Sequence, residues 1–410
     1  MKDSGIEWIG EIPEGWEVGQ IGQLYSERRT KVSDKDYPPL SVTMKGILPQ
    51  LSTAAKTDAH DDRKLVCKGD FAINSRSDRR GSCGISEQDG SISLINTVLK
   101  PRGEMNPGYY NWLFHTSMFA DEFYKWGHGI VDDLWTTGWS DMKKIGVPVP
   151  SKCEQKQLAE HLNVECSHID SILSKTCSSI EEYKKLKQSV ITQAVTKTIY
   201  DDFGNPSKFR KLRSLCDVLS KGTTPKDIET QNDEFYCIRY LKSENIVSNQ
   251  LNLNPTFFIT AETNNSLERS KLNSGDILFV IAGASIGKVA ITTADFLPAN
   301  TNQAVAFIRL SSSYQYATKY IWYFLQSDVV KQLIALSAVQ SAQPNLSLED
   351  LGAMRLPLPD QMGCLKITDY LDAKCAEIDG LIVKKEQLVK ELESYKKSLI
   401  YEVVTGKREV

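Results

Sequence analysis

The sequence lacks the features of a membrane protein or a secreted protein. No run of apolar residues approaches the roughly 18 that a membrane-spanning helix needs, and the first residues, MKDSG, contain no apolar stretch of the signal-peptide type. The nine cysteines are an odd number and show no CxxC or Cys/His ligand spacing, which argues against a disulfide framework and against a zinc site. We therefore expect a cytoplasmic protein with reduced thiols and no bound metal.

An excess of positive charge is also missing. The 410 residues include 49 Lys and Arg against 52 Asp and Glu, a formal net charge of -3. Neutralisation of phosphates supplies most of the affinity of a DNA-binding protein, so a protein that binds nucleic acid unaided usually has a basic surface. If this chain binds DNA, we expect partner subunits to supply much of the positive charge. Its 41% hydrophobic and 25% charged residues are otherwise typical of a globular protein, and its length suggests two or three domains.

What the sequence does contain is an internal duplication. A constant shift of 209 residues superimposes the segment 148–196 on the segment 357–405 without a gap. Such an offset predicts two copies of one structural unit. The identical pairs are Pro148/Pro357, Pro150/Pro359, Leu162/Leu371, Cys166/Cys375, Ile169/Ile378, Asp170/Asp379, Lys175/Lys384, Glu182/Glu391, Lys187/Lys396, Ser189/Ser398, Ile191/Ile400, Val195/Val404 and Thr196/Thr405.

Both duplicated segments have the pattern of long amphipathic helices. Apolar residues recur at intervals of three, four or seven between Lys and Glu, as expected for a helix that packs against a partner helix. Each helix follows a proline-spaced segment, 147–150 or 356–359, in which X-Pro pairs favour extended backbone. We predict that the two helices pack antiparallel, with Cys166 and Cys375 as small core residues. The positions expected to carry this packing and the packing of partner subunits are Leu162, Ile169, Ile172, Ile180, Val190, Leu371, Ile378, Leu381, Leu392 and Leu399.

The region before each helix is mixed rather than helical. Short β-rich runs bounded by Gly, Asn and Asp dominate both regions, and Gly69-Asp70 corresponds to Gly275-Asp276. At a shift of 210, Tyr110, Trp112, Phe114 and Ser117 correspond to Tyr320, Trp322, Phe324 and Ser327. We therefore predict an α+β protein with two mixed α/β domains and two long antiparallel helices. The expected boundaries are 1–147 for the first domain, 148–204 for its helix, 205–356 for the second domain and 357–410 for its helix.

The candidate catalytic motifs are weak. Asn254-Pro255-Thr256-Phe257 and Asn106-Pro107-Gly108-Tyr109 approximate the tetrad with which adenine methyltransferases hold a flipped base, but both lack the second proline. The segment 283–289 suggests a phosphate-binding loop, but its spacing is short and β-like residues follow it, so we expect a hairpin turn. The five histidines have neither metal-ligand spacing nor a nucleophile partner. We therefore predict that the chain is not an enzyme and binds no cofactor.

Several segments, in their order and duplicated placement, resemble the specificity subunit of type I restriction-modification systems. The likeness covers almost the whole chain. Two departures occur in the first copy: Trp139 with Asp141-Met142 stands where the second copy has Asn345-Leu346-Ser347, and Lys197-Thr198 replaces the Thr-Gly helix stop. The segments that resemble the family are 5–13 with Trp16, the hinges 147–150 and 356–359, 275–279, 343–347, 398–400 and 403–407.

This resemblance implies a DNA-binding subunit that performs no chemistry itself. Two target-recognition domains would each read one half of a split double-stranded DNA sequence, and two conserved helices would dock two methyltransferase subunits. S-adenosylmethionine would bind to those methyltransferase subunits, and nuclease or motor subunits would join the assembly. Two readings stay open beside this one: a subunit of a methylation-only system, and a coiled-coil adaptor whose globular parts bind protein without sequence-specific DNA binding.

The candidate base-reading residues lie in polar loops. Arg pairs with guanine and Asn or Gln with adenine, because their donors and acceptors match the edges of those bases. In the first domain the basic loop 74–81 provides Arg76, Ser77, Arg79 and Arg80. In the second domain the candidates are Lys242, Asn245, Asn300, Asn302 and Gln303. Asn-rich turns also form for local backbone reasons, and a solvated turn is the plain alternative for each of these loops.

The helix length suits a spacer between two DNA readers. The stretch 169–196 would extend about 40 Å at roughly 1.5 Å per residue. Two readers on one face of a duplex require about 34 Å, or one turn of DNA, between half-site centres. We therefore expect an asymmetric, bipartite target whose unread spacer is set by the helices.

Overall fold

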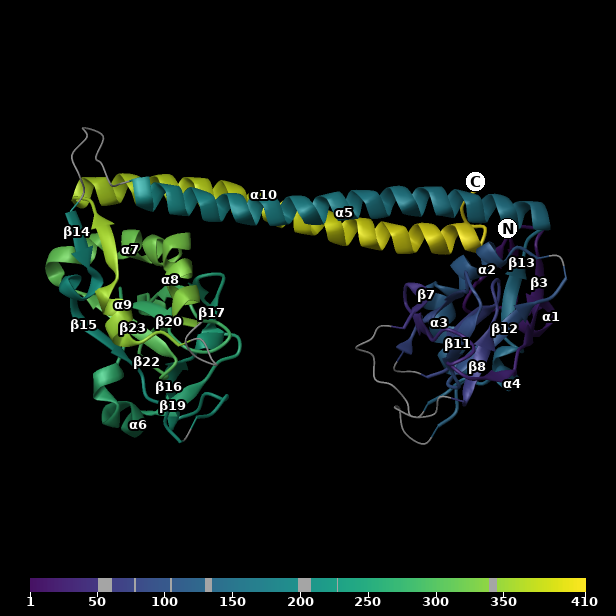
Figure 1. The fold of residues 1–410 in the computed structure, drawn as a ribbon, viewed down its shortest axis with the longest axis horizontal. Coiled ribbons are helices and arrows are strands. Elements are labelled where there is room, and N and C mark those ends of the chain that lie inside the picture. Colours follow the sequence, from purple (N-terminus) through teal and green to yellow (C-terminus); the bar gives the residue numbers. More distant parts are fainter. Residues whose placement is uncertain are drawn as a thin grey trace. The chain divides into compact units, whose positions relative to one another are not determined.

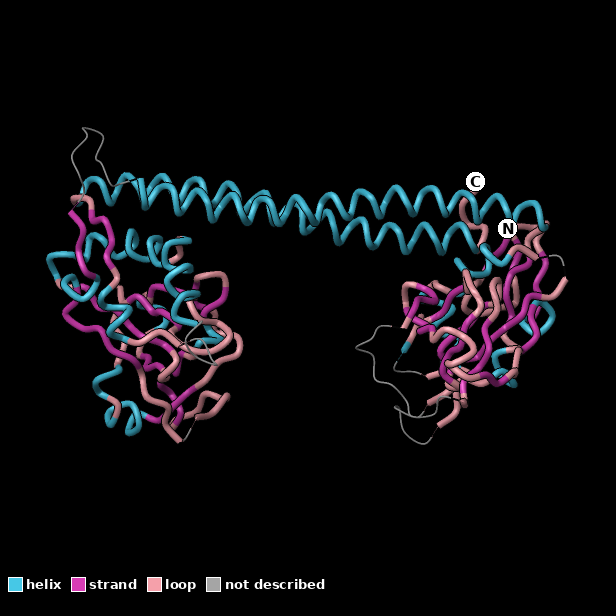
Figure 2. The backbone as a smooth tube through the Cα atoms, viewed as in Figure 1, coloured by secondary structure: helices cyan, strands magenta, loops and turns pink. Residues whose placement is uncertain are grey.

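The computed structural model describes residues 1–50, 61–76, 79–103, 105–129, 135–197, 208–226, 228–338 and 345–410. These residues form two units, and we call residues 1–177 with 387–410 unit 1 and residues 178–386 unit 2. Helices α5 (Lys152–Lys197) and α10 (Gln361–Val404) each contribute to both units (Figure 1). The mixed content of helices and strands confirms the predicted α+β class (Figure 2). Within the described ranges, no helix combines the length and apolar character that crossing a membrane requires.

Unit 1 is built on a four-stranded antiparallel sheet with the strand order β10-β9-β12-β4. A three-stranded sheet, β11-β8-β5, and the hairpin β6-β7 accompany it, and the hinge strand β13 pairs with β3. The strands are β1 (Lys2–Asp3), β2 (Glu11–Ile12), β3 (Glu17–Gln20), β4 (Tyr25–Glu27), β5 (Lys31–Val32), β6 (Leu40–Thr43), β7 (Gly46–Pro49), β8 (Arg63–Val66), β9 (Phe71–Asn74), β10 (Cys83–Ile85), β11 (Gly90–Ser93), β12 (Asn96–Pro101) and β13 (Gly146–Val149). The short helices are α1 (Ile21–Leu24), α2 (Pro107–Phe114), α3 (Ser117–Lys125) and α4 (Trp139–Met142).

Unit 2 repeats this plan. Its four-stranded sheet has the order β15-β23-β20-β21, which is the unit 1 order read from the other edge, and the hinge strand β24 pairs with β14. The second sheet, β19-β16-β22, contains a parallel pair and so differs from its unit 1 counterpart. The strands are β14 (Lys208–Lys211), β15 (Cys216–Lys221), β16 (Tyr236–Leu241), β17 (Ile246–Val247), β18 (Gln250–Leu251), β19 (Phe258–Thr260), β20 (Ile277–Val280), β21 (Val289–Ile291), β22 (Ala299–Thr301), β23 (Val305–Leu310) and β24 (Arg355–Leu358). The helices are α6 (Ala261–Ser266), α7 (Thr318–Leu325), α8 (Asp328–Ala338) and α9 (Leu348–Ala353).

Side-chain caps fix the ends of the long helices. A capping box starts α5: the Ser151 backbone N–H donates to Glu154 Oε2 at 2.9 Å, and the Glu154 N–H donates to Ser151 Oγ at 3.3 Å. At the start of α10, Asp360 Oδ1 accepts the N–H of Gly363 at 2.7 Å. Gly406, just beyond the end of α10, has φ +70°, the left-handed conformation that favours glycine after a helix. The predicted helix stop therefore operates in the second copy.

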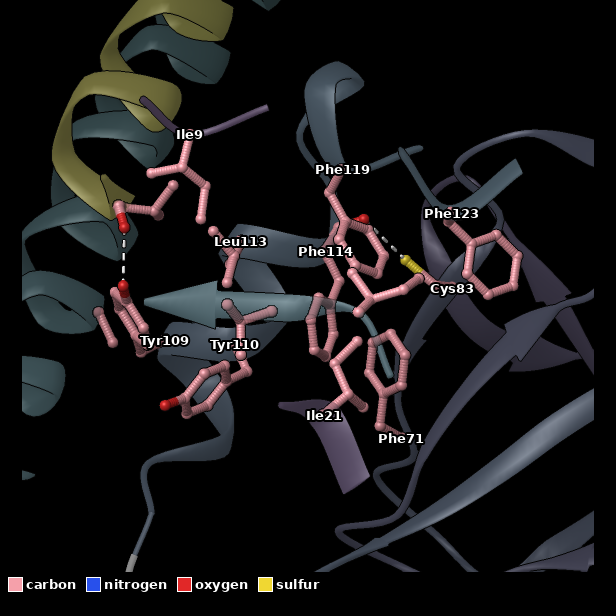
Figure 3. Packing of buried hydrophobic residues seen from close by; sticks show 14 of the residues in the cluster. Ile9, Ile21, Phe71, Cys83, Tyr109, Tyr110, Leu113, Phe114, Phe119 and Phe123 are labelled. Atoms are coloured by element: carbon pink, nitrogen blue, oxygen red, sulfur yellow. Dashed lines mark hydrogen bonds between the residues drawn. The ribbon is translucent and has the colours of Figure 1, made fainter. Parts of the chain in front are cut away.

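An aromatic core holds unit 1 to its helix pair. Figure 3 shows Phe71, Phe114 and Phe119 in this core, and the Phe114 and Phe119 ring centroids are 4.5 Å apart. The buried Tyr109 hydroxyl donates to the carbonyl oxygen of Val404 on α10 at 2.7 Å. Burial raises the pKa of this phenol well above its usual value, so the phenol stays protonated and keeps its role as a donor.

The two helices run antiparallel inside each unit. In unit 1, Asp170 of α5 pairs with Lys396 of α10 at 2.6 Å. In unit 2, Lys187 of α5 pairs with Asp379 of α10 at 2.6 Å. A shift of 209 relates the residues of one ion pair to those of the other. From the first pair to the second, the residue number on α5 rises from 170 to 187 while the residue number on α10 falls from 396 to 379. The first part of one helix therefore packs against the last part of the other, in agreement with the predicted antiparallel arrangement.

The structure corrects the match between the short aromatic helices. Asn106 precedes α2 and Ala317 precedes α7 as the capping residues, a shift of 211 rather than the expected 210. The Tyr109 hydroxyl donates to the carbonyl of Val404. The Tyr320 hydroxyl lies 3.3 Å from the repeat-equivalent carbonyl of Val195 and 2.6 Å from the carbonyl of Pro357, so these two tyrosines occupy equivalent positions. The prediction that Tyr110 corresponds to Tyr320 was wrong by one residue. Runs of neighbouring aromatic residues give chance identities at either shift.

A buried carboxylate supports both four-stranded sheets. Asp70 accepts from Arg28 Nε at 2.5 Å, and Asp276 accepts from Arg309 Nη2 at 2.7 Å. Each Asp follows a glycine with positive φ, +88° at Gly69 and +86° at Gly275, which confirms the structural meaning of the repeated Gly-Asp pair. Arg28 follows the end of β4, whereas Arg309 lies within β23, so the two units pair the same buried charge with arginines from different places in the fold.

Gly222 is a position where an added methyl group should be strongly destabilising. A Cβ at this position would lie 1.8 Å from the carbonyl oxygen of Thr301, an atom of the backbone that cannot move aside without disturbing β22. We expect Gly222→Ala to lower the free energy of unfolding of unit 2 by about 1–3 kcal/mol, measured by denaturant unfolding of the full chain. The control is Gly380→Ala in α10, where nothing lies within 4 Å and a gain of about 0.5–1 kcal/mol is expected. Equal effects of the two substitutions would contradict this prediction.

Candidate nucleic-acid interface

The arginine loop of unit 1, residues 75–82, joins β9 to β10. Arg76, Arg79 and Arg80 are all exposed, whereas the flanking strand residues are buried. Ser77, the fourth candidate in this loop, lies outside the described residues. The sequence therefore correctly indicated an exposed basic loop after a buried strand, which is a suitable position for contacts to phosphates and base edges.

Contacts with two neighbouring segments anchor this loop. The Arg76 backbone bridges to Thr136, and the Thr137 N–H donates to the carbonyl of Ser75 at 2.9 Å. The Arg80 guanidinium donates to Asp121 Oδ1 on α3 at 2.8 Å and lies 5.3 Å from the centre of the Tyr124 ring. Arg80 is thus oriented by α3. No pattern in the sequence pointed to Asp121 or Tyr124 as its neighbours, because the pairing depends on how α3 packs.

In unit 2 the side chains of Lys242 and Asn245 have different roles. The Lys242 ammonium lies 3.6 Å from the centre of the Phe257 ring, in a cation–π contact. Asn245 is buried, and its amide donates to the carbonyls of Asn252 at 2.9 Å and Pro255 at 2.7 Å. The Asn245 side chain is therefore used to shape its own turn, which is the local role that Asn commonly has.

The 300–303 segment also divides into buried and exposed residues. Asn300 is fully buried, and its amide donates to Asn264 Oδ1 at 3.0 Å. Asn302 is half-buried and accepts the Ala304 N–H at 3.2 Å, whereas Gln303 is exposed. Asn245 and Asn300 thus lie inside the fold and present no amide to the surface, contrary to what their polar, turn-like surroundings suggested. Asn245 bonds within its own turn, whereas the partner of Asn300 lies 36 residues away, so sequence spacing gave no sign of the Asn300 contact.

The helix positions fall into three groups. Val190 and Leu392 are partly buried against the two cores. Ile172 and Leu381 remain 47% and 36% exposed, so they are not part of the helix–helix core. They occupy repeat-equivalent positions at a shift of 209. The buried positions are Leu162, Ile169, Ile180, Leu371, Ile378 and Leu399.

Two cysteines at repeat-equivalent positions lie in the cores of the two units. Burial raises the pKa of the thiols of Cys166 and Cys375, so both stay protonated near neutral pH, as expected for core residues. Within the described part of the chain, no group of His, Cys, Asp and Glu could hold a metal ion.

Comparison with known families gives a consistent result. Residues 205–388 match the model of the family described as type I restriction modification DNA specificity domain. Over 97% of its length the chain is 24% identical to the type I restriction enzyme MjaVIII specificity subunit of Methanocaldococcus jannaschii and covers 93% of that protein. Over 52% of its length it is 28% identical to the type I restriction enzyme EcoBI specificity subunit of Escherichia coli, of which 48% is covered.

Solved structures support the fold. A chain from a study of complex assembly and conformational transition of the type I R-M system matches with a TM-score of 0.75 and 12% identity, over 97% of this chain and 100% of that one. The HsdS subunit from Thermoanaerobacter tengcongensis matches with a TM-score of 0.54 and 15% identity, over 97% and 98% of the two chains. At such low identity these likenesses show the fold alone.

Proposed function

We propose that the chain is a specificity subunit of a type I restriction-modification system, which its similarity to such subunits supports, and that each of its two units reads one half of a split, asymmetric DNA sequence. The observation that carries this proposal is the repeated four-stranded sheet with different surface loops. Because the two sheets are alike, each can support a DNA-contacting loop at an equivalent position. Because the side chains of the two loops differ, they favour different bases. The target is therefore bipartite and asymmetric.

The unread spacer between the two half-sites is set by α5 and α10. Each helix is continuous and contains residues of both units, which supports a role of the helix length in setting the spacer. The chain itself is not catalytic. S-adenosylmethionine binds to partner methyltransferase subunits, and restriction or motor subunits join that assembly in the cytoplasm. The net charge of -3 supports this assignment of roles. The chain has no excess of positive charge, so the partner subunits would supply cations that bind DNA phosphates.

Exposed apolar residues on the helices mark the docking positions for two methyltransferase subunits. Ile172 in unit 1 corresponds to Leu381 in unit 2, and Tyr395 in unit 1 corresponds to Leu186 in unit 2, all by the shift of 209. These side chains are between 36% and 48% exposed. Each unit therefore presents one copy of the same apolar pair, which suits two copies of one partner better than two unlike proteins.

A charge placed on this surface should remove one partner at a time. We expect Ile172→Glu to leave a complex with one methyltransferase subunit, and Ile172→Glu with Leu381→Glu to leave none, because burying an unpaired carboxylate costs several kcal/mol. The masses of co-purified complexes measure this. Met44→Glu is the control, since Met44 is 71% exposed on the β6-β7 hairpin and away from the helices. Retention of both partners by the double variant would exclude this docking surface.

Mapping methylated bases in the DNA of cells that produce the chain with its methyltransferase tests the central proposal. We expect one motif with two defined halves and an undefined spacer of fixed length. A continuous motif would contradict the two-reader arrangement. Absence of any sequence preference would favour the adaptor reading in place of DNA recognition.

A further inference from the structure

The loop between β20 and β21 in unit 2 has the same backbone frame as the arginine loop of unit 1. The two loops span residues 281–288 and 75–82, and both place a glycine with positive φ one residue before the end, +88° at Gly287 and +72° at Gly81. In each loop the carbonyl of the final residue accepts the N–H of the last residue of the strand before the loop. This distance is 2.9 Å both for Val280 to Lys288 and for Asn74 to Ser82.

A second segment flanks both loops in the same way. Ala282 bridges to Asn345 in unit 2, as Arg76 bridges to Thr136 in unit 1. The next residue then donates its N–H to the first residue of the loop. Leu346 donates to the carbonyl of Ile281 at 2.8 Å, the counterpart of the Thr137 contact described above. The shift from Thr136 to Asn345 is 209, so this pairing also corrects the expected match of Asp141-Met142 to Asn345-Leu346.

The side chains on the two frames differ. The arginine loop presents three cations, whereas the β20-β21 loop presents Gly283 and Ala284 at its exposed tip and half-buried Ser285 and Lys288. Asn345 beside it is exposed. Among the described residues, none of the Ser285 hydroxyl, the Lys288 ammonium and the Asn345 amide takes part in a hydrogen bond or ion pair. These groups remain available, unlike the amides of Asn245 and Asn300.

We propose that the β20-β21 loop together with Asn345 is the DNA-reading element of unit 2. This inference rests on the proposed function and names the site through which unit 2 carries it out. The Asn345 amide has the donor and acceptor that match adenine, and Lys288 supplies a cation for a phosphate or for guanine. The small residues at the loop tip allow the backbone to approach the DNA closely. The motif that resembled a phosphate-binding loop is a hairpin, as expected from the sequence, and its ligand is duplex DNA.

Methylation mapping of cells that produce the full complex tests this assignment. The unchanged chain first defines the two halves of the motif. Asn345→Ala with Lys288→Ala should then make one half degenerate, with a loss of discrimination of about 10- to 100-fold at the affected bases. The other half should stay intact, and it should be the half that is lost when the arginine loop is altered. Arg269→Ala, which removes an exposed cation from the 3-10 helix Glu268–Ser270 of unit 2, is the charge-matched control.

The possible results separate this inference from the function on which it rests. If the unchanged chain yields a two-part motif and the double variant yields the same motif, the assignment of this loop is wrong while the proposed function stands. Equal loss at both halves would show a role in stability or in general phosphate binding and would also overturn the assignment. If the double variant fails to assemble, Asn345→Ala alone provides the same test, because its side chain is exposed and supports no contact among the described residues. A chain without any two-part motif would instead refute the proposed function.

Discussion

A chain with both Arg76→Ala and Arg79→Ala is expected to lose recognition of one half of its DNA target while the other half is read as before. Both side chains are exposed on the arginine loop. A bidentate arginine–guanine contact contributes about 1–3 kcal/mol of discrimination against a wrong base, so two such contacts would change specificity by about 30-fold or more. Methylation mapping of the double variant, co-produced with its methyltransferase subunits, measures the change at each position.

The matched comparison is Arg80→Ala. Arg80 is already engaged by Asp121 and Tyr124, so its loss should loosen the loop and weaken recognition less selectively. Thermal unfolding of each variant distinguishes a misfolded loop from a missing contact. Equal weakening of both halves by the double variant at unchanged stability would mean that these arginines bind phosphates only, since phosphate contacts carry no sequence information.

Lengthening both long helices by one heptad is expected to lengthen the unread spacer by about three base pairs. Seven residues add about 10 Å of helix at 1.5 Å per residue, and base pairs are stacked about 3.4 Å apart. Repeat-equivalent insertion points are after Ser178 in α5 and after Gln387 in α10. A heptad keeps the apolar face of each helix in nearly the same orientation, so the packing around the Asp170–Lys396 and Lys187–Asp379 pairs should survive.

Insertion into α5 alone is the control for this experiment. It would shift one helix against the other by two turns, which should break the register of the helix pair and abolish assembly with the methyltransferase subunits. Motif mapping of the double-insertion chain gives the spacer directly. An active double-insertion chain with an unaltered spacer would refute the idea that the helices set the distance between half-sites.

The parts of the fold that follow from local pattern could be predicted from the sequence. The shift of 209 located both long helices, because heptad spacing and proline hinges depend only on residues near one another. It also matched Asp170 with Asp379 and Lys187 with Lys396, although only the structure shows that these four residues form two copies of one ion pair. The repeated Gly-Asp pair marked equivalent turns, but the partner arginines are not equivalent, since Arg28 follows β4 and Arg309 lies within β23.

The parts that depend on long-range packing could not be predicted in the same way. Tyr109 and Tyr320 were matched only through the helix carbonyls to which they donate. Their polarity alone suggested that Asn245 and Asn300 contact DNA at the surface. In the structure the Asn245 amide donates to the backbone carbonyl of Asn252, and the Asn300 amide donates to the side chain of Asn264. The sequence predicted only a hairpin turn for the β20-β21 loop, because the spacing of its phosphate-loop-like motif is short and β-like residues follow it. Only the bridges to Thr136 and Asn345 reveal that it shares its frame with the basic loop.

The two units pack on equivalent parts of the two long helices. Unit 1 rests on the early part of α5 and the late part of α10, and unit 2 rests on the late part of α5 and the early part of α10, with equivalent side chains at Ile169 and Ile378. A hybrid chain in which both globular parts have the same sequence would have two identical DNA-recognition units on two antiparallel helices. Such a hybrid should recognise a palindromic DNA site. The symmetry of the site would then depend on which units are combined, not on the helices that carry them.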